Sequence, residues 1–259
     1  MKTSSILFIS TIMMLTLTLV FQITLKDAEI SYDNKPLNSL SKFWMDRYDI
    51  HVQQSFAKPI KYLKIAGNDQ ESHTYITIKE NKQPGLFSST PLSFTHELHG
   101  DTLILRPIAG AYSAIEIKQP RSTALELLTL ARGDATINGF REDELTLHVS
   151  EGSTLLVGSA YARSNERNRI GKLHLYVKNS STVSLDKFMS NTVEANLENG
   201  ILKYTAGVEV DTMQVNLKGR STVLAQQAEV VNQVKNLFIS GNQTYFKKER
   251  VGKNVGIIR

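Results

Sequence analysis

Side chains that could hold a ligand recur at fixed spacing through the second half of this chain. They are imidazoles, carboxamides, aromatic rings and hydroxyls, and apolar residues alternate with them. Side chains on a β-strand point alternately to opposite faces, so the polar ones would share an exposed face. One outward position holds Thr129, His148, Tyr176, Asn196, Asn216 and Phe238. The position two residues upstream holds Thr146, His174, Glu194, Gln214 and Asn236.

As neighbouring rungs of a parallel sheet, about 4.8 Å apart, these residues would form a flat patch. Carboxamides can both donate to and accept from sugar hydroxyls, and ring faces can pack against sugar CH groups. We therefore predict a binding surface made of His148, His174, Tyr176, Glu194, Asn196, Gln214 and Asn216. A plainer explanation stays open, because any exposed sheet face needs polar side chains.

Metal binding and catalysis are the alternatives to simple binding. His148, His174 and Glu194 would be an acceptable zinc ligand set if the strand register brings them together. A polysaccharide hydrolase needs about two acidic groups that converge on the bond, whereas Glu194 and Glu198 lie on one strand without acidic neighbours on adjacent rungs. A Ser-His-Asp elbow, a P-loop and a dinucleotide-binding glycine pattern are also missing. We expect no enzymatic activity, no metal and no cofactor, with a polysaccharide hydrolase or lyase as the alternative.

The elements that must position these residues repeat along the chain. Segments such as "LHVSEGSTLL", "LYVKNSSTVS" and "VNLKGRSTVL" share an alternating strand, a polar turn and a second strand. The last apolar residues of the first strands are Leu130, Val149, Val177, Leu197, Leu217 and Ile239, at gaps of 19, 28, 20, 20 and 22 residues. A period near 20 indicates stacked repeats, because one short repeat cannot bury its apolar face alone. The sequence therefore predicts an all-β fold, a parallel β-helix.

Leucine-rich repeats and an antiparallel sandwich are the alternative architectures. Leucine-rich repeats have a similar period but need a helix-forming segment, and the intervening stretches here are rich in Thr, Val, Gly and Asn. An antiparallel sandwich does not explain why the inward positions keep the same offset from the turn.

Together with "HELHGDTLIL" (His96 to Leu105) and "INGF", these repeats resemble the bacterial envelope family named "putative auto-transporter adhesin head GIN domain". The resemblance covers roughly Pro59 to Phe246 and consists of spaced Leu, Val, Gly and Ser/Thr, without a catalytic signature. It implies a single-stranded, right-handed parallel β-helix outside the cytoplasmic membrane. The chain departs from the family's commoner secretion or lipoprotein signals, since it has no cysteine to lipidate.

The amino terminus is typical of a membrane anchor. Ile6 to Leu25 carries no charge, and a helix needs about 20 apolar residues to cross a bilayer. A cleaved signal peptide is the alternative, although Lys26 stands where the cleavage site at Ala28 wants a small residue. More lysines follow the span than precede it, which by the positive-inside rule favours a cytoplasmic body. Because of the family resemblance, we instead expect a single-pass cell-membrane protein whose body is exported, periplasmic or extracellular.

The predicted organisation is an anchor or signal segment at 1–25, a linker and N-terminal cap at 26–57, a GIN-like β-helix at 58–250 and a tail at 251–259. The expected function is non-catalytic adhesion or binding at the cell envelope, to a glycan or a protein partner. An envelope sensing or assembly module stays an alternative. The net charge of +5 is modest, and we expect no nucleic-acid partner.

Overall fold

The computed structural model describes residues 11–18, 20, 52–67, 72–90, 93–158, 168–205, 207–225, 233–247, 251 and 256–258. The chain divides into two compact units, Met1–Ile50 and His51–Arg259.

In the first unit, residues 11–18 form a helix. The hydroxyls of Thr16 and Thr18 donate to the carbonyl oxygens of Ile12 and Met14, four residues earlier, so the helix itself satisfies them. Within the described part of the chain, no helix is both long enough and apolar enough to span a bilayer. Residues 6–10, 19 and 21–25 of the predicted span lie outside the described residues, and the transmembrane anchor stays a prediction.

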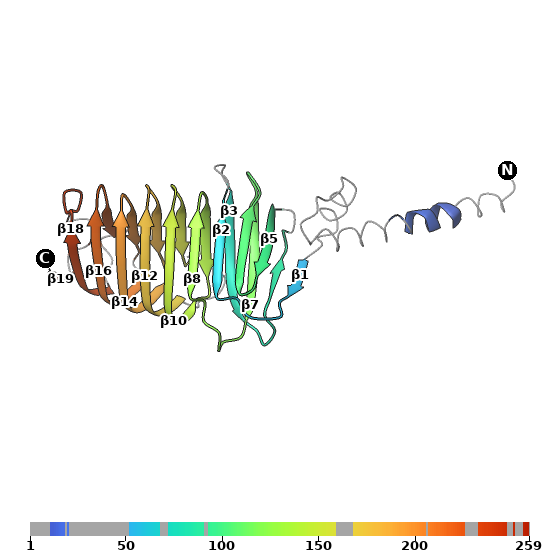
Figure 1. The fold of residues 1–259 in the computed structure, drawn as a ribbon, viewed down its shortest axis with the longest axis horizontal. Helices are drawn as coiled ribbons and strands as arrows, with labels where there is room; N and C mark the ends of the chain where they lie inside the picture. The colour runs from blue at the N-terminus through green and yellow to red at the C-terminus, as the bar shows by residue number, and fades with distance from the viewer. Residues whose placement is uncertain are drawn as a thin grey trace. The chain divides into compact units, whose positions relative to one another are not determined.

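The second unit is all-β, as predicted, and its strands form two large mixed sheets (Figure 1). Sheet B has the order β19-β18-β16-β14-β12-β10-β8-β2-β6-β5. Its strands are β2 (Tyr62–Ala66), β5 (Phe94–His99), β6 (Thr102–Pro107), β8 (Leu127–Ala131), β10 (Arg141–Ser150), β12 (Asn168–Lys178), β14 (Phe188–Glu198), β16 (Val208–Lys218), β18 (Gln233–Gly241) and β19 (Gly256–Ile258).

Sheet A has the order β1-β4-β7-β3-β9-β11-β13-β15-β17. Its strands are β1 (Val52–Ser55), β3 (His73–Glu80), β4 (Gly85–Ser88), β7 (Tyr112–Gln119), β9 (Asp134–Asn138), β11 (Thr154–Val157), β13 (Thr182–Leu185), β15 (Ile201–Tyr204) and β17 (Thr222–Ala225).

From β8 to β18 the chain alternates between the two sheets, and neighbouring strands within each sheet are parallel. The longer strands, such as β12 and β14, enter sheet B, and the four-residue strands that follow them enter sheet A. The register pairs Val149 with Val177, Val177 with Leu197, and Leu197 with Leu217. For these four residues the predicted alignment of like positions is confirmed.

Buried apolar columns between the sheets make the core. In sheet B, one column consists of Leu147, Leu175, Ala195 and Val215. In sheet A, the matching column consists of Leu155, Val183, Leu202 and Val223. Each fully buried Leu or Val side chain contributes roughly 1.5–3 kcal/mol relative to exposure. The core therefore holds the two sheets together along the whole series of repeats.

The turns that lead from sheet B to sheet A use left-handed backbone and buried serines. Glu151, Asn179 and Asn199 occupy equivalent turn positions and have φ values of 61°, 54° and 53°. Ser153 and Ser181 follow the turns in the core wall, where the Ser153 backbone N–H donates to the Ser181 hydroxyl oxygen at 3.2 Å. Because buried donors need partners, these serines join successive turns across the rungs.

The N-terminal part of the second unit departs from the predicted uniform parallel β-helix. Three strand pairs are antiparallel: β1 with β4, β4 with β7, and β5 with β6. The order is also exchanged, since β2 lies between β8 and β6, and β3 lies between β9 and β7. After β7 the chain therefore passes the hairpin of β5 and β6, because β8 lies beside β2 on the side away from β6. The prediction of one parallel β-helix across residues 58–250 is corrected to two mixed sheets.

The C-terminal residues contact the end of the core. The Tyr204 hydroxyl donates to the carbonyl oxygen of Val251 at 2.8 Å, and both residues are buried. Strand β19 then pairs in parallel with β18.

Candidate functional site

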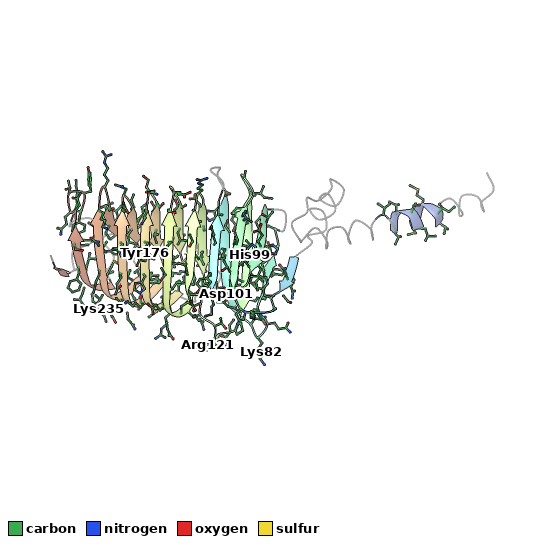
Figure 2. The ribbon with its side chains drawn as sticks, in the orientation of Figure 1. Lys82, His99, Asp101, Arg121, Tyr176 and Lys235 are labelled. Carbon is green, nitrogen blue, oxygen red and sulfur yellow. The ribbon has the colours of Figure 1, made fainter. Side chains whose placement is uncertain are left out.

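The seven predicted site residues lie on four neighbouring strands of sheet B, β10, β12, β14 and β16. The register pairs His148 with Tyr176, Tyr176 with Asn196, and Asn196 with Asn216. In the second row, two residues upstream on each strand, His174 pairs with Glu194, and Glu194 with Gln214. All seven alternate with buried apolar residues, so the sheet presents them on its outward face. Tyr176 is the labelled residue among these central strands in Figure 2.

The first row combines two rings with two carboxamides. The rings of His148 and Tyr176 meet edge to face with centroids 4.7 Å apart, a favourable aromatic geometry. The side-chain N–H of Asn216 donates to the side-chain oxygen of Asn196 at 3.3 Å. Tyr176 is 37% exposed, so part of its ring is open to solvent. The row therefore offers a ring surface with amide hydrogen-bonding groups directly beside it.

The surroundings of the His148 imidazole favour its neutral form by lowering its pKa. Burial, and secondarily the charge of Lys178, lower the pKa of His148 below its usual value. A neutral ring keeps one nitrogen as donor and the other as acceptor, which suits hydroxyl groups of a ligand.

The second row is organised around His174. Its Nε2 lies 2.9 Å from a carboxylate oxygen of Glu144, and its Nδ1 lies 3.1 Å from a carboxylate oxygen of Glu194. Lys172 Nζ is 3.0 Å from the other oxygen of Glu194. Carboxylates only accept, so Nε2–H of His174 donates the hydrogen bond to Glu144, while Nδ1 makes a close polar contact with Glu194. These contacts tie β10, β12 and β14 together beside Tyr176.

Sequence reasoning missed Glu144 and Lys172 as members of this surface. They pair with each other in the register, one outward position further upstream than His174. Glu144 reaches His174 diagonally, a contact that long side chains make across a sheet. The signal was available, because Glu144 and Thr146 continue the same outward alternation on β10.

The predicted position of two flanking residues is wrong. Phe238 pairs with Gln214, and Asn236 pairs with Thr212, whereas the sequence alignment placed each of them one outward position further along. The same shift pairs Ile239 with Val215 instead of Leu217. A register shift of two residues keeps every side chain on its face, so the alternation alone could not reveal it.

His148, His174 and Glu194, the ligand set of the metal-binding alternative, do not converge on one point of this surface. Among the residues that the structure describes, no group of three His, Cys, Asp or Glu side chains is placed to hold a metal ion. Instead, His174 is engaged by Glu144 and Glu194, while the ring of His148 packs on Tyr176. The arrangement supplies hydrogen bonds, ring faces and paired charges.

The chain matches no protein-family model and no curated protein. Solved structures that resemble it include a "putative adhesin" from Bacteroides fragilis, at 12% identity and a TM-score of 0.44 over 81% of this chain and 97% of the other. A "putative lipid binding protein" from Parabacteroides distasonis has 11% identity and a TM-score of 0.44, over 81% and 97%. A "putative adhesin" from Parabacteroides merdae has 12% identity and a TM-score of 0.40, over 81% and 96%. The resemblance to the GIN family thus stays a prediction.

Proposed function

We propose that this chain is a non-catalytic binding module of the cell envelope, and that the outward face of sheet B binds a saccharide. The row His148, Tyr176, Asn196 and Asn216 carries the proposal, because rings and carboxamides follow one another on adjacent rungs. Sugars present apolar CH faces and paired hydroxyls, which match ring surfaces and carboxamides respectively.

The regular spacing of the row favours a polymer over a single sugar. Neighbouring rungs repeat about every 4.8 Å, so equivalent groups recur along the face. The contacts of His148 with Tyr176 and of Asn216 with Asn196 hold these side chains in place before any ligand arrives. Such ordering lowers the entropy cost of binding.

A glycan array with the full chain, purified in detergent, tests this proposal. Tyr176→Ala and His174→Ala should each lose binding to the same subset of the glycans that the unaltered protein binds, because the first removes the ring and the second removes the group that holds Glu144 and Glu194. Tyr245→Ala is the matched control, since Tyr245 is 45% exposed and lies outside sheet B. An array profile that is unchanged for every glycan in both Tyr176→Ala and His174→Ala would discard the proposed surface.

We further propose that the body is exported and that residues 6–25 anchor it in the cytoplasmic membrane. The support is the uncharged run from Ile6 to Leu25, of which residues 11–18 are helical. Fractionation and N-terminal sequencing should find the intact chain in the membrane fraction. A soluble protein that begins near Ala28 would instead identify a cleaved signal peptide.

For the fold, we propose that residues 127–241 wind as a right-handed parallel β-helix of the GIN type. The alternation of strands between the sheets and the parallel register within each sheet support this winding. Crossover connections between parallel strands of one sheet are right-handed in about 98% of cases, which favours that hand.

A further inference from the structure

The outward face of sheet A carries a second group of aromatic and polar side chains, on β3, β7 and β9. In one row, His73 pairs with Tyr112 on one side and with Asp134 on the other. In the next row, Tyr75 lies between Ala114 and Thr136. These three strands are neighbours in the sheet, with β3 in the middle.

The two rings of the first row share one orientation. The planes of His73 and Tyr112 differ by 6°, and their centroids are 6.2 Å apart. Tyr112 is 56% exposed, more than any other large apolar side chain that the structure describes in the second unit. The exposed Tyr112 ring is a candidate for contact with a partner, because binding would remove its apolar area from water.

Hydrogen bonds hold the rings of this group in place. Nε2 of His73 lies 3.0 Å from the hydroxyl oxygen of Thr136. The side-chain N–H of Asn138 donates to the hydroxyl oxygen of Tyr75 at 2.9 Å. Thr136 and Asn138 are buried although the strand alternation directs them outward, so other residues cover them. The rings are therefore ordered before a ligand binds.

The charge of the group suits a neutral ligand. Burial raises the pKa of Tyr75, so its hydroxyl stays uncharged and can donate a hydrogen bond. The nearest carboxylate on β7 belongs to Glu116, which forms ion pairs with Lys79 and Lys118. Asp134, at the end of its row, accepts the backbone N–H of Thr154 at 3.2 Å. Rings, hydroxyls and amides thus predominate over unpaired charge.

We infer that this surface is a second saccharide site, built on His73, Tyr75 and Tyr112 and selective for neutral oligosaccharides. It goes beyond the site proposed for sheet B and uses none of its residues. The core lies between the sheets, so the outward faces point to opposite sides of the body. One chain would therefore hold two glycan strands at once and link them.

Saturation-transfer NMR on the full chain in detergent tests this inference, with cellotetraose, chitotetraose, mannotetraose and maltotetraose as neutral probes. The Tyr176→Ala variant, whose sheet B site is disabled, should still bind at least one probe. Adding Tyr112→Ala should weaken that binding about two- to tenfold or more, the range expected for loss of one stacked ring. Adding Tyr112→Phe instead should preserve it, because the phenylalanine keeps the ring.

The possible results separate this inference from the proposal for sheet B. Equal affinity with and without Tyr112→Ala, or no binding of any of the four probes to the Tyr176→Ala variant, overturns the second site. If Tyr112→Ala reduces the binding and Tyr176→Ala leaves it unchanged, the second site is supported and the sheet B surface does not bind these four probes. Tyr245→Ala should change neither, and equal thermal midpoints for all variants show that each is folded.

Discussion

Glu142 places its carboxyl group on the inward face of sheet B. It is 8% exposed and pairs in the register with Ile170, a fully buried apolar residue. Burial is the main cause that raises its pKa to about 7, and the charge of Asp143 adds to this. The backbone N–H of Leu125 acts in the opposite direction by hydrogen bonding to the carboxylate.

This raised pKa makes stability fall as pH rises. Between the ordinary pKa of 4.5 and the folded value of about 7, the folded chain binds more protons than the unfolded chain. The free energy of unfolding should therefore decrease by roughly 2–3 kcal/mol from pH 5 to pH 8 on account of this group.

Urea unfolding of Glu142→Gln at several pH values measures the effect. The amide cannot ionise, so the decrease over this range should largely disappear. Glu198→Gln is the control, because Glu198 is on the exposed side of β14 and should leave the pH dependence as it is. An unchanged pH dependence in Glu142→Gln would contradict the assignment.

Leu197 and Asn196 are adjacent residues that point to opposite sides of β14. Leu197 is 1% exposed within the core, whereas Asn196 is on the outward face. Leu197→Asp should prevent folding, because it buries an unpaired carboxylate and removes an apolar side chain. Asn196→Asp should change the free energy of unfolding by no more than about 0.5 kcal/mol. Circular dichroism and urea unfolding compare the two, and equal damage would mean that the faces are assigned wrongly.

Gly158, which directly follows β11, is under a steric constraint. It has φ of 89°, and a Cβ built there would lie 1.7 Å from the carbonyl oxygen of Asp186 on the next repeat. Gly152 also has positive φ, at 75°, but a Cβ there meets nothing within 4 Å. Close packing of neighbouring repeats, and not only backbone conformation, therefore requires glycine at Gly158.

Alanine at these two positions separates the two causes. Gly152→Ala should cost about 1–2 kcal/mol, the price of left-handed backbone in a residue with a Cβ. Gly158→Ala should cost several kcal/mol more, because backbone of the adjacent repeat must move. Thermal and urea unfolding of both variants measure the difference, and equal costs would refute the close contact.

The repeats from β8 to β17 could be predicted because the inward and outward positions of each repeat can be read from its own alternation. Alternation placed Leu197 in the core and Asn196 outside, and the turn residues fixed the offset. The neighbours of β2 and β3 were not predictable in this way. Alternation is the same for parallel and antiparallel partners, and it does not specify which rung lies beside which.

The candidate surfaces, too, could be predicted only in part from the sequence. Alternation found the outward residues of sheet B, but diagonal contacts such as that of Glu144 with His174 depend on side-chain reach. On sheet A, "HTYITIK" and "YSAIEIK" do carry matching alternation at residues 73–79 and 112–118. Only the pairing of β3 with β7 and β9 brings Tyr112, His73 and Thr136 together, and that pairing joins segments about 40–60 residues apart in the chain.

At the scale of the whole second unit, one core supports two independent outward faces. Sheet B offers rings, carboxamides and the ionic contacts of His174, and sheet A offers a largely uncharged group of rings. A body of this kind can contact a polymer on either side without enclosing it.

Fluorine NMR with 3-fluorotyrosine incorporated at the 9 tyrosines tests the central claim most directly, since it reports where a glycan contacts the protein. Resonances are assigned with single Tyr→Phe variants, and the best ligand from the glycan array is then titrated into the full chain. The Tyr176 resonance should shift with ligand concentration while that of Tyr245 stays in place. A saturating ligand that leaves the Tyr176 resonance in place would contradict it.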